Sequence, residues 1–275
     1  MSASIRRTDI LALSNLREDG RKPLEIRRMR IQLGALKGSF AGSAVVEMGL
    51  TIALATVRGP LEVQRRAEEL PDRAILDVTV KAAPFCAPDR RVMNPNTDRR
   101  LIELSHMLKR AMEAAVLLHL FPKSRFEIVV CVLADDGGRL CAAVNAATLA
   151  LMDAGIPMKD FVCACSAGYH ELGGGSAGND SSMTLVDLNR REESSQGGQP
   201  AVNLPCAMMP QRGTIVLAQC EARLPNFEAM ERVLEAAMTG CRAIFEIMQA
   251  AVKERAATQL AARNGTASVE LAFTT

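Results

Sequence analysis

The amino-acid sequence predicts an α+β fold in which helices pack on a mixed β-sheet. Segments in which apolar and polar residues alternate come in pairs separated by short turns, which is typical of hairpins. Segments with apolar residues at three- and four-residue steps follow them and predict amphipathic helices. Strands grouped in hairpins, rather than alternating one by one with helices, favour α+β over a doubly wound parallel sheet.

The first half of the chain is predicted to supply a strand, a hairpin, a further strand and a helix. Alternation over residues 26–33 predicts the first strand. Residues 43–47 and 51–58 form a hairpin around Gly49, and Gly59-Pro60 is expected to close it. Residues 75–83 continue as a strand. Leu101, Leu104 and Leu108 lie on one face of a predicted helix over residues 99–119.

The most informative segment runs from residue 128 to residue 161. It reads as a buried strand, a Gly-rich turn and a helix of small residues that ends at Gly155, because Pro157 cannot continue it. Further strands are expected at 161–168, 183–188 and 214–221, and a last helix at 225–255. Two polar, Gly- and Ser-rich segments, 171–182 and 190–203, are predicted to be surface loops. We therefore expect an arm over 1–15, one domain over 16–255 and a tail over 256–275.

Composition limits the classes of function. The chain has 275 residues and a formal net charge of +2, so nucleic-acid binding would have to come from local basic clusters. Eight cysteines include no Cys-x-x-Cys pair, which argues against a zinc site and favours buried, reduced thiols. We see neither a signal peptide nor an 18-residue apolar run, which predicts an intracellular protein without a membrane span.

Several separated blocks resemble the RNase PH family. They are REDGR at 17–21, VEMG at 46–49, LPDRA at 70–74, RRLIELS at 99–105, NAATLALMDAGIPM at 145–158, VDLN at 186–189 and LPCAMMP at 204–210. The resemblance, over residues 16 to about 255, implies the RNase PH fold, which is related to the second domain of ribosomal protein S5. It also implies a ring subunit of an RNA exosome core. The implied partners are RNase PH-like ring subunits in a hexameric ring, cap proteins, an associated exonuclease and single-stranded RNA, in the nucleus, nucleolus and cytoplasm.

The resemblance also identifies a candidate site. Active members carry Gly-Thr-Arg at the turn before the small-residue helix, and we interpret Leu140 in Gly138-Arg139-Leu140 as standing at the phosphate-binding Arg position. Their two acidic positions match Glu193 and Asn203, and a neutral Asn cannot replace a metal-bridging carboxylate. This predicts a degenerate former active site with no catalytic residue, no metal and no cofactor. The chain is then expected to be a non-catalytic subunit that supports 3′→5′ RNA processing.

Two alternatives stay open. One is an active phosphate-dependent 3′→5′ exoribonuclease with Glu193 and either Asp187 or Asp136 as a metal pair, although Asp187 is interpreted as structural. The other is a free RNA-binding module. Phe85 is expected in the core, so RNA contacts would be directed at the backbone. The predicted RNA-binding residues are Arg65, Arg66, Arg90, Arg91, Arg99, Arg100 and Arg139.

Overall fold

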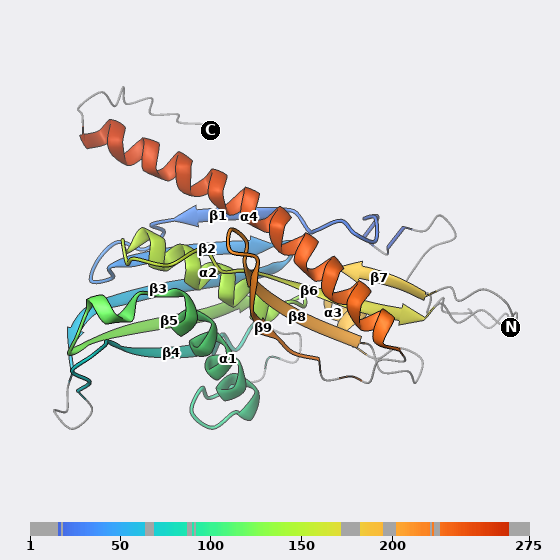
Figure 1. The fold of residues 1–275 in the computed structure, drawn as a ribbon, viewed down its shortest axis with the longest axis horizontal. Helices are drawn as coiled ribbons and strands as arrows, with labels where there is room; N and C mark the ends of the chain where they lie inside the picture. The colour runs from blue at the N-terminus through green and yellow to red at the C-terminus, as the bar shows by residue number, and fades with distance from the viewer. Residues whose placement is uncertain are drawn as a thin grey trace, which may run out of the picture.

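The computed structural model describes residues 16–17, 19–63, 69–86, 90, 92–171, 182–194, 202–220, 222 and 226–263. Helices and strands pack together as an α+β fold, which confirms the predicted class (Figure 1). The strands form two sheets, one of five strands in the order β1-β2-β3-β5-β4 and one of four in the order β7-β6-β8-β9. The sequence patterns did not separate these two sheets.

The bounds of the elements agree with most of the predicted segments. The strands are β1 Met29–Leu33, β2 Gly42–Met48, β3 Thr51–Glu62, β4 Ile75–Ala82, β5 Ser124–Ala134, β6 Cys163–Glu171, β7 Ser182–Val186, β8 Val202–Met209 and β9 Thr214–Ala218. The helices are α1 Arg99–Ala115, α2 Arg139–Asp153, α3 Arg190–Glu193 and α4 Phe227–Arg263, with a 3₁₀ turn η2 at Leu118–Leu120.

The five-stranded sheet is mixed, and the segments that follow β4 and β5 leave it at the same end. Strands β1, β2 and β3 pair antiparallel, and β5 lies between β3 and β4. Strands β4 and β5 run parallel, with Ala82 beside Val132. The carboxyl ends of both strands therefore lie at the same end of the sheet. There the Asp135 amide, after β5, donates to the Cys86 carbonyl, after β4, at 3.0 Å.

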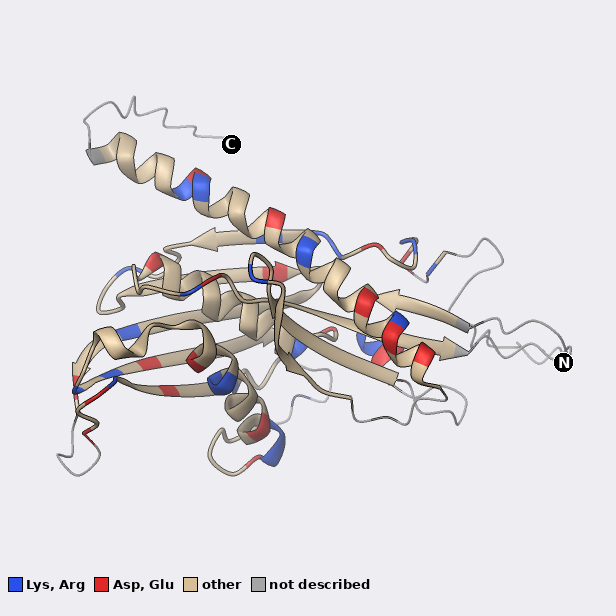
Figure 2. Cartoon of the chain, in the orientation of Figure 1, with Lys and Arg blue, Asp and Glu red and all other residues tan. Residues whose placement is uncertain are grey.

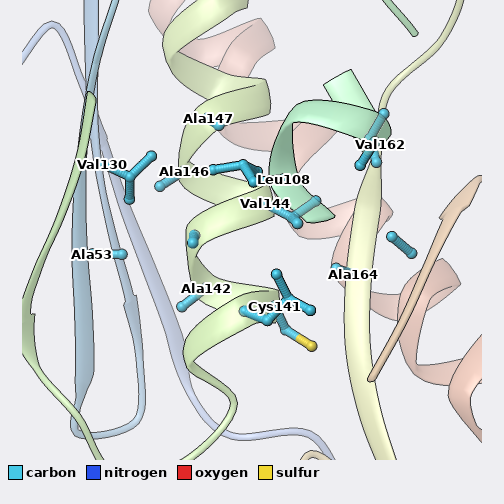
Figure 3. Close-up of a cluster of buried hydrophobic side chains, with 14 of the residues drawn as sticks. Ala53, Leu108, Val130, Cys141, Ala142, Val144, Ala146, Ala147, Val162 and Ala164 are labelled. Carbon is cyan, nitrogen blue, oxygen red and sulfur yellow. The ribbon is translucent and has the colours of Figure 1, made fainter. Parts of the chain in front are cut away.

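Helix α2 lies between the two sheets and is buried on nearly every side. Figure 3 shows Ala142 and Ala146 of this helix between Val130 of β5 on one side and Ala164 of β6 on the other. Small side chains allow the close approach that the helix needs. At Gly42 of β2 a Cβ would lie 2.3 Å from the carbonyl oxygen of Ala150, near the end of α2, so only glycine fits this contact.

The four-stranded sheet is covered by helices on opposite faces. Asn145 of α2 donates to the Ala164 carbonyl at 3.0 Å and accepts from the Ala164 amide at 2.8 Å. The next residue of β6, Cys165, lies against Gly240 of α4. Because successive strand residues face opposite sides, α2 and α4 pack on the two faces of this sheet. Figure 2 shows acidic and basic residues interspersed along α4.

Several boundaries differ from the sequence-based expectation. Strand β3 continues past Gly59-Pro60 to Glu62 through a shift in its pairing with β5. Helix α1 ends at Ala115 rather than at residue 119, and α4 continues beyond residue 255 to Arg263. The segment 190–203, predicted as a surface loop, begins with helix α3, and Glu192 in it is buried. The arm over 1–15 and most of the loop 171–182 lie outside the described residues.

Candidate active site at the start of helix α2

The turn that leads from β5 into α2 depends on two glycines. Gly137 and Gly138 have φ values of 88° and 66°, a region that residues with a Cβ rarely adopt. A Cβ at Gly137 would lie 2.6 Å from the backbone nitrogen of Arg190, because the start of α3 packs directly against the turn. The amide of Arg190 donates to the Asp136 carbonyl at 3.0 Å. The turn therefore aims the amino terminus of α2, a favourable position for an anion, at α3.

Glu193, the last residue of α3, lies at this helix start. Its Oε1 accepts from the Gly138 amide at 2.8 Å and from Asn203 Nδ2 at 3.2 Å. Burial raises the pKa of the Glu193 carboxyl, and the Gly138 hydrogen bond only partly opposes this. Asn203 Oδ1 is buried and has no hydrogen-bond partner among the residues that the structure describes. The structure thus brings together Glu193 and Asn203, which lie on either side of the loop between α3 and β8.

Arg139 supplies the positive charge at the site. It is the first residue of α2, and its guanidinium forms an ion pair with Asp135. Leu140 has an exposed fraction of only 8% and belongs to the hydrophobic core. Leu140 packs in the core, whereas Arg139 interacts electrostatically with Glu193. The interpretation that Leu140 stands at the family's phosphate-binding Arg position stays a prediction, and Arg139 places a cation at this site.

A buried ion pair between Arg27 and Asp187 holds the turn in place. Arg27 Nη2 donates to Asp187 Oδ1 at 2.7 Å and to the Gly137 carbonyl at 3.2 Å, and Nη1 donates to the Asp136 carbonyl at 3.0 Å. Burial disfavours the charged guanidinium, but Asp187 outweighs it and raises the pKa of Arg27. Asp187 is 1% exposed and has a φ of 56°. Both of its carboxylate oxygens bind Arg27, so it is not available as half of a metal pair.

Apart from Arg139, the predicted RNA-binding residues fall into two groups. Arg90, Arg99 and Arg100 are exposed, and the last two open α1 at its projecting end, where Figure 2 shows basic residues. Arg99 Nε donates to Glu103 at 2.7 Å. Arg65, Arg66 and Arg91 lie outside the described residues.

One aromatic residue differs from its prediction. Phe85 is not in the core: 69% of it is exposed, one residue from the Cys86 carbonyl that binds the Asp135 amide. Phe85 is exposed because it lies in the turn after β4, which extends away from the end of the sheet and does not cover its apolar face.

Sequence reasoning missed the buried arginines Arg17 and Arg27 and the buried Glu192. Their partners are separated from them by 160 to 175 residues, so no local pattern reveals the pairs. The Arg-x-Asp-Gly-Arg block was the available signal, since it carries two of the arginines that reach Asp187. Within the described ranges, no group of three or more His, Cys, Asp or Glu could hold a metal ion. The helices of the described chain include none long and apolar enough to cross a membrane.

A helix start, an arginine and a buried carboxyl converge at this site, and a helix start beside an arginine favours an anion. Residues 25–157 match the RNase PH family, described as a 3′ exoribonuclease family, domain 1. The chain is 40% identical over 247 residues to the human exosome complex component RRP41, covering 90% of this chain and 94% of that protein. It is 39% identical over 239 residues to Rrp41 of Thermococcus kodakarensis, covering 87% and 89%. The chain therefore belongs to the RNase PH family.

Solved structures support the same fold. Rice Rrp46 superposes with a TM-score of 0.70 at 24% identity, covering 86% of this chain and all of that one. A structure of the Archaeoglobus fulgidus exosome with RNA bound to the active site superposes with a TM-score of 0.67 at 23% identity, covering 85% and 92%.

The prediction that the chain is not an enzyme is wrong. The family to which it belongs is an exoribonuclease family, and the relatives cover nearly the whole chain. The prediction treated two substitutions, at 140 and 203, as loss of the site. The first leaves Arg139 as a cation at the start of α2. The second leaves a polar amide, whose Nδ2 donates to Glu193 at 3.2 Å, rather than an apolar surface.

Proposed function

We propose that the chain is a core subunit of an RNA exosome and that it catalyses phosphate-dependent removal of nucleotides from the 3′ end of RNA. Membership of an exoribonuclease family and the similarity to exosome components support this proposal. The observation that carries it is the placement of the Glu193 carboxyl 2.8 Å from the Gly138 amide at the start of α2, next to Arg139. An acid, a cation and a helix amino terminus then act at one point.

The chemistry assigns a task to each of these groups. In phosphorolysis an oxygen of inorganic phosphate bonds to the phosphorus of the last phosphodiester, and the bond from that phosphorus to the 3′ oxygen of the preceding nucleotide breaks. The products are a nucleoside diphosphate and an RNA one nucleotide shorter, and the leaving 3′ oxygen takes up a proton. A carboxyl with a raised pKa, such as Glu193, is suited to supply that proton. Arg139 and the helix start offset phosphate charge.

A divalent cation is implied by the family, but the residues present do not fit one. Mg²⁺ prefers oxygen ligands. Asn203 directs its Nδ2 group, not its oxygen, at Glu193 Oε1, which also accepts from the Gly138 amide, so the two residues do not present a pair of oxygens to an ion. No step of the proposed reaction is therefore assigned to a metal ion.

Partners follow from the same proposal. We expect RNase PH-like neighbours in a hexameric ring, cap proteins, an associated exonuclease and single-stranded RNA, in the nucleus, nucleolus and cytoplasm. Large apolar side chains on the surface of this chain support such neighbours, because partners would cover them. Leu50 is 71% exposed, Phe227 80% and Leu24 63%.

The test uses the tagged chain purified together with its ring partners. The complex is incubated with single-stranded RNA, Mg²⁺ and inorganic phosphate, and nucleoside diphosphate release is measured. We expect phosphate-dependent release that falls at least about 100-fold with Glu193→Gln, since a positioned general acid contributes roughly that much. The matched control is Glu231→Gln, which makes the same chemical change at an exposed position of α4 and should leave release unchanged.

Two results would overturn the proposal. One is a complex that releases no nucleoside diphosphate with phosphate present. The other is release that Glu193→Gln does not alter, which would assign the activity to another subunit.

A further inference from the structure

Arg17 is buried beneath the segment that carries the proposed catalytic acid. Its side chain is fully shielded from solvent, and its guanidinium makes a bidentate ion pair with Glu192, with Nε 2.9 Å from Oε1. Nη1 donates to the Val186 carbonyl at 2.6 Å, and Nη2 donates to the Asp187 carbonyl at 2.9 Å. The guanidinium therefore reaches across to residues 186–192 and binds both ends of that segment.

Arg21 and Asp19 extend the same attachment toward the surface. Arg21 Nη2 donates to Asn189 Oδ1 at 3.0 Å, and Nη1 donates to the Asp187 carbonyl at 3.2 Å. Asn189 Nδ2 donates in turn to Asp19. We call Arg17, Asp19 and Arg21 the N-terminal clamp. Arg17 binds the start of α3 from the buried side, and Arg21 binds it nearer the surface.

Helix α3 depends on this clamp for its shape. It contains four residues, too few to be stable by its own hydrogen bonds. Glu192 accepts from the Asn189 amide at 2.8 Å in a capping box, and the same carboxylate is the one that Arg17 binds. The clamp thus fixes both the cap of α3 and the strand end that precedes it.

Glu193 follows Glu192 in the chain, and α3 packs against the Gly137-Gly138 turn before α2. The 2.8 Å hydrogen bond from the Gly138 amide to Glu193 Oε1 forms only if α3 holds Glu193 close to that turn. A buried ion pair adds little stability compared with well-packed apolar residues, but it specifies one arrangement of the groups around it. We propose that the N-terminal clamp is a positioning device for Glu193, with Arg17 as its central positioning residue. This inference rests on the proposed function, because it names what aligns that acid.

The test separates alignment from stability with two variants. Arg17→Lys keeps a charge but loses the planar, bidentate contact. Arg21→Gln changes the more exposed part of the clamp and protects the experiment if Arg17→Lys fails to fold. In the purified complex we expect kcat to fall at least about tenfold for Arg17→Lys, with little change in KM for RNA or phosphate, because small misplacements of a catalytic group are costly. A smaller fall in kcat is expected for Arg21→Gln.

A second readout does not depend on activity. The carboxyl of Glu193 is titrated by ¹³C NMR, and the Gly138 amide shift is followed in the isolated chain. The clamp variants should move the Glu193 titration toward the ordinary Glu range and shift the Gly138 amide. If wild type proves inactive, the proposed function fails while this readout still decides the positioning role.

The control for stability is Leu76→Ala, a core truncation near the start of β4, away from the site. It should lower Tm as the clamp variants do, without moving kcat, the Glu193 titration or the Gly138 amide. Equal loss of kcat in Leu76→Ala, or clamp variants that leave kcat and both NMR signals unchanged, would overturn the inference.

Discussion

Two sets of arginines in this molecule serve opposite purposes. Arg17 and Arg27 are 2% and 6% exposed, and each directs its guanidinium at carbonyl groups and a carboxylate of the protein. Arg99 and Arg100 open α1 in solvent, where Arg99 pairs with Glu103 one turn away. Buried guanidinium groups have lost their water and must be matched by fixed partners, so they set geometry. Exposed ones keep their water and stay available to a polyanion.

The largest expected effect comes from breaking a buried pair. Asp187→Asn leaves Arg27 charged and buried without its carboxylate, and Asn still tolerates the positive φ at this position. The free energy of unfolding should fall by about 3–5 kcal/mol. The double variant Arg27→Met, Asp187→Asn should lose less than the sum of the single changes, which denaturant unfolding measures.

The more exposed pair Arg125–Asp77 provides the matched comparison for that experiment. Asp77→Asn makes the same substitution where both side chains reach solvent, and it should cost less than about 1 kcal/mol. Equal losses at Asp187 and Asp77 would remove the distinction between buried and exposed arginines in this protein.

A smaller effect is expected at the exposed set. Replacing Arg99 and Arg100 together by Gln should weaken binding of single-stranded RNA to the complex. The slope of log K against log salt should become shallower by about 0.7 for each RNA phosphate that is no longer neutralised. The control is the pair Arg232→Gln and Arg242→Gln on α4, where Arg232 has an equivalent ion pair with Glu228. A slope that stays constant would show that Arg99 and Arg100 are only solvated surface.

The smallest effect on stability is expected at Glu193. Burial raises its pKa above the ordinary value of 4.5, so the folded state binds its proton more tightly than the unfolded state does. The contribution to stability is therefore complete below the ordinary value and is lost as pH rises through the folded pKa. Chemical unfolding of wild type and Glu193→Gln from pH 4 upward should show the wild type losing stability relative to the variant. A constant difference would contradict the raised pKa.

The local patterns of the sequence predicted the elements that local physics determines. The hairpin at β2 and β3 and the small-residue helix α2 follow from periodicity and from Gly and Pro at their ends. The prediction of a surface loop at 190–203 was wrong at its start. Glu192 is polar and looks like a loop residue, but it is buried because it pairs with Arg17, 175 positions away. Long-range ion pairs leave no periodic trace.

The candidate site was located correctly in part. The Gly-rich turn and Glu193 were identified as neighbours through the resemblance, and the structure brings them into contact. The sequence could not show which neighbours of the turn contact one another. The structure places Leu140 in the core and Arg139 at the start of α2, where it pairs with Asp135. The interpretation of Leu140 as standing at the family's phosphate-binding Arg position stays a prediction.

Gly42 links the five-stranded sheet to the candidate site through helix α2. Its backbone touches the far end of α2, a helix of 15 residues whose other end meets Glu193. At 1.5 Å per residue those ends are about 22 Å apart. A methyl group added at Gly42 would have to push the helix aside there, and a rigid helix pressed at one end tilts at the other. We therefore expect Gly42→Ala to displace the start of α2 relative to Glu193, although the two positions lie at opposite ends of the helix.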